Sequence, residues 1–165
     1  LSTAVEFSIG LAGFSGIVAA MNRSARWTEL ERYRVVNLLQ AALTPAFLSF
    51  LGMGMSHYYQ GDPRAWEMAC LGGGLVAIAF VARVFHGKSK LSADDVKGLR
   101  QGIMYSLTLS ITVLGILQLI AVGGVFATHT FLLFYAGITL YMLTGAILFG
   151  VAIFRSRNVM AKQES

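Results

Sequence analysis

Five long runs of apolar residues, separated by short polar stretches, dominate the hydrophobic pattern of this chain. The runs cover residues 1–22, 35–56, 66–85, 102–126 and 131–154. A helix needs about 20 residues to cross about 30 Å of hydrocarbon at about 1.5 Å per residue, and each run approaches or exceeds that length. None alternates in polarity as a membrane strand of about 10 residues would. The pattern therefore predicts an all-α integral membrane helical bundle of about five transmembrane helices.

Two of the polar stretches carry signals for the start of a helix. Thr28 precedes Glu31 by three positions, and Ser92 precedes Asp95 in the same way, which is the pattern of a capping box. The second and fourth helices should therefore begin near Glu29 and Ala93, ahead of their apolar runs. We expect a single transmembrane domain over residues 1–165, with helices at about 1–22, 29–59, 66–85, 93–126 and 131–154.

The basic residues predict how the bundle is oriented. Only Arg64 lies in the connection between the second and third runs, whereas the other twelve of thirteen lysines and arginines fall in alternate connections or in the tail. They are Arg23, Arg26, Arg32, Arg34, Arg83, Lys88, Lys90, Lys97, Arg100, Arg155, Arg157 and Lys162. Since basic residues collect on the cytoplasmic side, we expect the N-terminus outside and the C-terminus in the cytoplasm. An odd number of spans fits that arrangement.

Composition supports a membrane protein and narrows its partners. The chain is 56% apolar and 13% charged, against about 45–50% and about 25% in soluble domains. Its net charge is +5, and the basic residues flank the apolar runs. We therefore expect membrane lipids and no nucleic acid as partners. Cys70 is the only cysteine, which excludes an intrachain disulfide and a cysteine-based metal motif. Arg83, at the end of the third run, should snorkel to the interface.

Small residues predict where helices pack closely. Such residues let the backbones of membrane helices approach each other, so we expect a tight contact, within the bundle or between protomers. The candidates are Gly10, Gly13 and Gly16 in the first run and Gly73 and Ala77 in the third. Glu6 lies within about 40° of Gly10 and Gly13 on a helical wheel, with Gly16 nearby. As an ionisable residue inside a span, it is a candidate functional group, with simple hydration at the interface as the alternative.

Polar residues at the outer level suggest a second kind of site. Two carboxylates and two imidazoles from four segments could bind a divalent metal or relay protons. These residues are Glu6, His57, Glu67 and His129. Their spacing matches no metal motif, so the identity of any metal is unknown. An interfacial belt of tyrosine, tryptophan and hydrated charges remains the alternative.

Two helices carry internal polar stripes. The second has Asn37, Gln40 and Thr44, and the fourth has Ser110, Thr112 and Gln118. Such groups either hydrogen-bond between helices or, together with Glu6, line a proton or ion path. Pro45 should also bend the second helix, with Thr44 a candidate partner for the carbonyl that proline frees near residue 41.

One stretch supports a resemblance to known proteins. The sequence from Glu6 to Val18 is similar to the opening helix of small multi-pass bacterial inner-membrane proteins of unknown function, and Arg26-Trp27 and Leu43-Thr44-Pro45 look similar too. The resemblance covers about the first third of the chain. It implies a bacterial inner (cytoplasmic) membrane location and no particular activity, ligand or site.

These observations favour a non-enzymatic multi-pass membrane protein. It would act through helix packing, as a homo-oligomer or as a small subunit of a larger membrane complex. The alternative is an ion or proton channel, or a small transporter, that uses Glu6 and the two polar stripes. The sequence contains no hydrolase, zinc-protease, Walker or dinucleotide-binding motif. We therefore expect no catalytic residues and no cofactor besides bound lipid.

Overall fold

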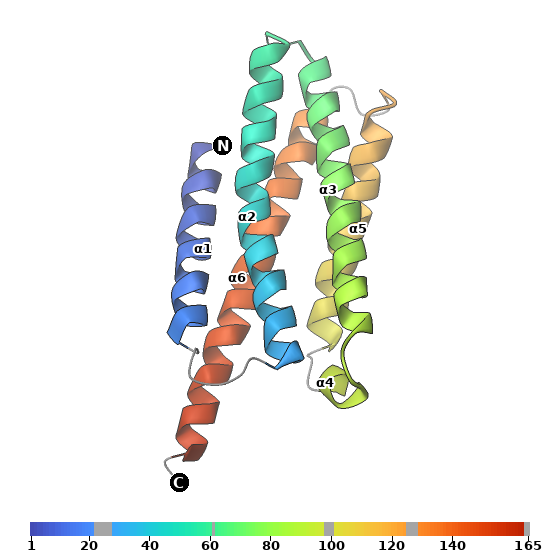
Figure 1. The fold of residues 1–165 in the computed structure, drawn as a ribbon. Helices are drawn as coiled ribbons and strands as arrows, with labels where there is room; N and C mark the ends of the chain where they lie inside the picture. The colour runs from blue at the N-terminus through green and yellow to red at the C-terminus, as the bar shows by residue number, and fades with distance from the viewer. Residues whose placement is uncertain (22–27, 61, 98–100, 125–128, 164–165) are drawn as a thin grey trace.

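The computed structural model describes residues 1–21, 28–60, 62–97, 101–124 and 129–163, with the backbone alone at 15, 17–21 and 153–163. Every regular element in these ranges is an α-helix (Figure 1). The helices are α1 (Ser2–Met21), α2 (Glu29–Tyr58), α3 (Arg64–Ser89), α4 (Ala93–Lys97), α5 (Gln101–Ala121) and α6 (Thr130–Gln163). The predicted all-helical class is confirmed.

Four of the described helices are long and apolar enough to cross a membrane. They are α2, α3, α5 and the part of α6 from Thr130 to Ala152. Their length follows from the apolar runs, since about 20 such residues span the hydrocarbon layer. Four of the five predicted spans therefore have the necessary length and composition. A crossing by α1, a helix of 20 residues, stays a prediction, as does the orientation of the bundle.

The four long helices form an antiparallel bundle, and α1 packs on its outside. Around the bundle α2 contacts α3, α3 contacts α5, α5 contacts α6, and α6 contacts α2. In addition α3 meets α6 across the middle, while α1 lies against α2 and α6 (Figure 1). The short connections of the chain force this order, because successive long helices must run in opposite directions.

The core lies where α3 and α6 meet. Phe80 of α3 and Tyr141 of α6 contact edge to face, with ring centroids 5.4 Å apart. Phe134 and Ile138 of α6 and Ile111 of α5 belong to the same buried cluster, and none of the five is more than 3% exposed. Large side chains therefore fill the centre of the bundle, and α2 and α5 lie on opposite sides of it.

Both predicted helix caps are present. Thr28 Oγ1 accepts the backbone N–H of Glu31 at 3.2 Å, and the Glu31 carboxylate accepts the N–H of Thr28 at 3.0 Å. Ser92 Oγ accepts the N–H of Asp95 at 3.2 Å. These bonds satisfy N–H groups that have no partner within the helix, so α2 and α4 begin at Glu29 and Ala93, as predicted.

Several helix ends differ from those predicted. The single helix expected over 93–126 is two helices, because α4 ends at Lys97 and α5 runs from Gln101 to Ala121. A turn then follows in which Gly124 has a φ of 78°, a conformation that glycine adopts without strain. By contrast, α3 and α6 extend beyond the expected 66–85 and 131–154. An apolar run marks only the hydrocarbon-spanning part of a helix, and polar turns can continue it.

Pro45 lies inside α2, which continues as a helix to Tyr58. Thr44 Oγ1 donates to the carbonyl of Gln40 at 2.7 Å, so Thr44 is not the partner of the carbonyl at Ala41 that we expected. The freed carbonyl instead lies against Gly145 of α6, where an added Cβ would come within 3.6 Å of the Ala41 oxygen. A glycine at this position therefore allows α6 to pack closely on α2 at the proline.

Candidate functional site

Glu6 lies on the outer face of α1. Its side chain is exposed, whereas Ala4 and Ser8 are buried where α1 packs on α2 and α6. Gly10 and Gly13 share the outer face, and a Cβ added to either would meet nothing within 4 Å. Glu6 and the glycines do lie on one face, as the helical wheel predicted. The tight contact expected for this face is not inside the bundle, because α1 packs through the opposite face.

The predicted outer cluster is not assembled in the described part of the chain. His57 is exposed at the end of α2, Glu67 is half-buried in the first turn of α3, and His129 is exposed just before α6. Helix α1 begins well below the level at which α2 ends and α3 begins (Figure 1). Among the described residues, no three histidine, cysteine, aspartate or glutamate side chains are placed to hold a metal ion.

The two polar stripes lie on different parts of the bundle. On α2, Asn37 and Gln40 are half-buried, and the Oε1 atom of Gln40 is buried without a partner among the described residues. On α5, Ser110 is exposed and donates to the Ser106 carbonyl of its own helix at 3.0 Å. Thr112 likewise donates within α5, to the carbonyl of Thr108 at 2.8 Å.

Gln118, the remaining member of the α5 stripe, connects three helices. Its side chain is 2% exposed, and Nε2 donates to the Leu133 carbonyl of α6 at 3.1 Å. Gly73 of α3 and Gly137 of α6 flank its amide, since a Cβ added to them would lie 2.7 Å from Oε1 and 2.4 Å from Nε2. Nearby, Ala77 packs directly on Gly115 of α5. Gln118, Gly73 and Ala77 therefore all lie at closely packed helix contacts.

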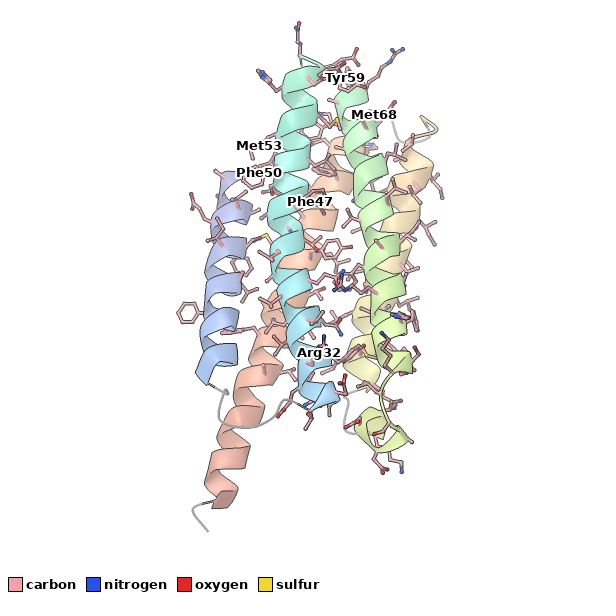
Figure 2. The ribbon with its side chains drawn as sticks, viewed as in Figure 1. Arg32, Phe47, Phe50, Met53, Tyr59 and Met68 are labelled. Atoms are coloured by element: carbon pink, nitrogen blue, oxygen red, sulfur yellow. The ribbon has the colours of Figure 1, made fainter. Side chains whose placement is uncertain are left out.

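A cleft of about 580 Å³ opens between the start of α2 and the end of α3. We call this end of the bundle, which also carries α4, the basic end. Four basic side chains line the cleft, together with one carboxylate and a set of polar and apolar groups. The lining residues are Arg32, Arg83, His86, Lys90, Glu29, Tyr33, Asn37, Val36, Ala82, Gly87 and Leu91. Figure 2 labels Arg32 near the lower end of α2.

Local helix geometry brings these groups together. Arg83 and His86 lie three positions apart on one face of α3, and Lys90, the C-cap residue of that helix, follows four positions later in line with them. Lys88 lies on another face, where its ammonium contacts the hydroxyl of Tyr105 on α5. Because the capping box at Thr28 starts α2 at Glu29, Arg32 lies in the first turns of that helix, beside the basic residues at the end of α3. Sequence reasoning missed this cleft, although the spacing on α3 was a usable signal.

Tyr33 forms the floor of the cleft. Its hydroxyl donates to the Val84 carbonyl of α3 at 3.3 Å and lies 3.4 Å from Met104 Sδ of α5. Its ring occupies the space beside Gly87, where an added Cβ would come within 2.9 Å of it. These contacts fix the separation of α2 and α3 at the basic end, so the cleft is part of the packed fold.

Comparison of the chain with known protein families, with curated proteins and with solved structures found no match.

Proposed function

We propose that this chain is a non-enzymatic multi-pass membrane protein that assembles with a second copy of itself through the outer face of α1. The observation that carries the proposal is the position of Glu6 beside Gly10 and Gly13 on a face that none of the described residues covers. The resemblance of this helix to bacterial inner-membrane proteins supports a location in the inner membrane. The distribution of basic residues supports an N-terminus outside and a C-terminus in the cytoplasm.

The shape of this face supports close packing of two helices. The glycines form a shallow strip, and larger exposed side chains flank it, with Ile9 on one side and Phe7 and Phe14 on the other. A two-fold contact sets the same surface against itself. The bulky side chains of one copy can then lie in the glycine strip of its partner. Membrane helices associate through such close backbone approach, because lipid offers no hydrophobic gain for clustering.

Glu6 gives a further reason for a partner. A carboxylate that faces hydrocarbon is costly, and Glu6 projects from the outer face of an apolar helix. In a two-fold contact the two Glu6 side chains would approach each other. The contact would then shield both groups from lipid.

The test compares Gly13→Leu with Gly54→Leu. Neither glycine has an atom within 4 Å of an added Cβ, so both variants should fold. We expect the wild type and Gly54→Leu to form the same oligomer in native mass spectrometry from mild detergent, and Gly13→Leu to be monomeric. Glu6→Gln should retain the oligomer, since an amide pair can hydrogen-bond in the same place.

The same measurement can reject the proposal. A wild type that is monomeric in mild detergent, or an unchanged oligomer in Gly13→Leu, would show that the α1 face is not a contact between copies. If a different membrane polypeptide is extracted with the wild type and lost in Gly13→Leu, the chain is a subunit of a mixed complex and the second-copy assignment is wrong.

A further inference from the structure

We propose that the cleft at the basic end binds the phosphate group of an anionic membrane lipid. This inference is independent of the α1 contact and rests only on the membrane placement proposed above. Arg32 from α2, Arg83 from α3 and Lys90, the residue that follows the last turn of α3, line the same cavity. Basic pockets between membrane helices on the cytoplasmic side are suited to anionic headgroups.

The charges of the cleft are available to a ligand. Arg32, Arg83 and Lys90 are exposed, and within the described ranges none of them has a carboxylate within 4.0 Å. Glu29 is the one acidic residue among the lining groups, so positive charge predominates even with His86 neutral. Arginine side chains bind phosphate oxygens through paired N–H donors, and a lysine adds a point charge.

Polar neutral groups give the cleft a defined shape. Asn37 supplies an amide at its inner side, and Tyr33 closes the floor through its contacts with α3 and α5. The Tyr33 ring fits beside Gly87 because that residue has no side chain. A phosphate in this position would therefore contact both helices, which a diffuse basic surface could not ensure.

The surface beside the cleft suits the acyl chains of a lipid. Val36 and Ala82 line the cavity, and the same faces continue with Leu43 and Phe47 on α2 and Leu75 on α3, all at least half exposed. Figure 2 labels Phe47 about midway along α2, well above Arg32. From Val36 to Phe47 the helix rises about 16 Å, close to half of the about 30 Å of hydrocarbon. This length matches one leaflet, with the cleft at headgroup depth.

The experiment measures binding of single lipids to the detergent-solubilised full chain by native mass spectrometry. We expect phosphatidylglycerol to bind more tightly than phosphatidylcholine of the same acyl chains. Arg32→Gln combined with Arg83→Gln should weaken phosphatidylglycerol binding by about 25-fold, because each cation near an anionic headgroup contributes about fivefold. The matched control removes two cations of the basic end outside the cleft, Lys88→Gln with Lys97→Gln, and should change the affinity less than threefold.

A second variant distinguishes lipid binding in the cleft from nonspecific electrostatic attraction to the basic end. Ala82→Trp adds bulk to an exposed position of the cleft and leaves every charge in place. It should weaken phosphatidylglycerol binding by about tenfold or more. Circular dichroism and gel filtration report whether each variant is folded. Equal loss in the cleft and control double variants, with no effect of Ala82→Trp, would overturn the proposal in favour of nonspecific attraction.

Inorganic phosphate distinguishes a lipid from a soluble ligand. If phosphate alone displaces phosphatidylglycerol from the wild type at comparable concentration, and Ala82→Trp abolishes binding of both, the cleft takes a soluble phosphate compound and the lipid assignment is wrong. If phosphate competes only at a large excess, the acyl chains contribute to binding, as the proposal requires. A wild type with no preference between the two lipids would also overturn it.

Discussion

The side-chain amide of Gln118 on α5 donates a hydrogen bond of 3.1 Å to the backbone carbonyl of Leu133 on α6. The amide lies between two glycines, Gly73 of α3 and Gly137 of α6. Three helices therefore meet at one polar side chain that is almost fully buried. In an apolar surrounding such a bond orients the helices, because an unpaired amide there would be costly.

Gln118→Leu should destabilise the bundle modestly. The substitution keeps a side chain of similar size and removes the hydrogen bond, which is worth about 0.6–2 kcal/mol between membrane helices. We expect a lower midpoint of thermal unfolding in detergent, followed by circular dichroism. Ser110→Ala is the matched control, since Ser110 is exposed and bonds only within α5. An unchanged midpoint in Gln118→Leu would mean that this contact does not hold the three helices together.

Substitutions at the flanking glycines should cost more than loss of the amide. In Gly73→Val or Gly137→Val the new Cβ would lie within 2.7 Å of Gln118 atoms, so helices must separate or Gln118 must move. Overpacking of this kind typically costs about 1–3 kcal/mol. Gly54→Val provides the control, because a Cβ there meets nothing within 4 Å. Equal unfolding midpoints for all three variants would contradict the packing described here.

The sequence predicts more of the fold than of the candidate site. Apolar runs determine helices directly, because the hydrocarbon layer requires continuous apolar length, and the caps at Thr28 and Ser92 are local in sequence. The direction in which a helix face points is not local. Glu6, Gly10 and Gly13 fall on one face by spacing alone. Whether that face points into the bundle depends on the opposite face, where Ala4 and Ser8 are buried and α1 packs on α2 and α6.

The cleft shows the same limit. The spacing of Arg83, His86 and Lys90 defines a basic face at the end of α3, but the sequence does not show which helix lies opposite. That information comes from Tyr33 of α2, whose ring requires the space beside Gly87. A tyrosine–glycine contact across 54 positions, the difference between 87 and 33, has no local signature.

Gly87→Val should disrupt the basic end more than Tyr33→Phe. A Cβ at Gly87 would lie 2.9 Å from the Tyr33 ring and force it out of place. Tyr33→Phe keeps the ring and loses only the hydroxyl contacts with Val84 and Met104, and the hydrogen bond to Val84 is worth about 0.5–1.5 kcal/mol. We expect the order wild type, Tyr33→Phe, Gly87→Val in falling thermal stability. Gly87→Val should also increase proteolysis near the α3–α4 connection. A variant Gly87→Val as stable as the wild type would show that the ring does not pack here.

The orientation of the bundle can be tested by cysteine accessibility. Cys70 is buried and its Sγ donates to the Thr130 carbonyl at 3.3 Å, so Cys70→Ser gives an unreactive background that keeps a donor. Single cysteines then replace Ser89 at the basic end and Asp62 at the opposite end, both of which are exposed.

Because basic residues remain in the cytoplasm, an impermeant maleimide should label the cysteine at position 62 in intact cells. The cysteine at position 89 should react only after the membrane is opened. If the maleimide labels both cysteines before permeabilisation, while a cytoplasmic control protein stays unlabelled, the long helices do not separate these positions across a membrane. The reverse pattern, with position 89 labelled from outside and position 62 protected, would place the basic end outside. The lipid site would then have to face the outer leaflet, where the argument from cytoplasmic headgroups does not apply.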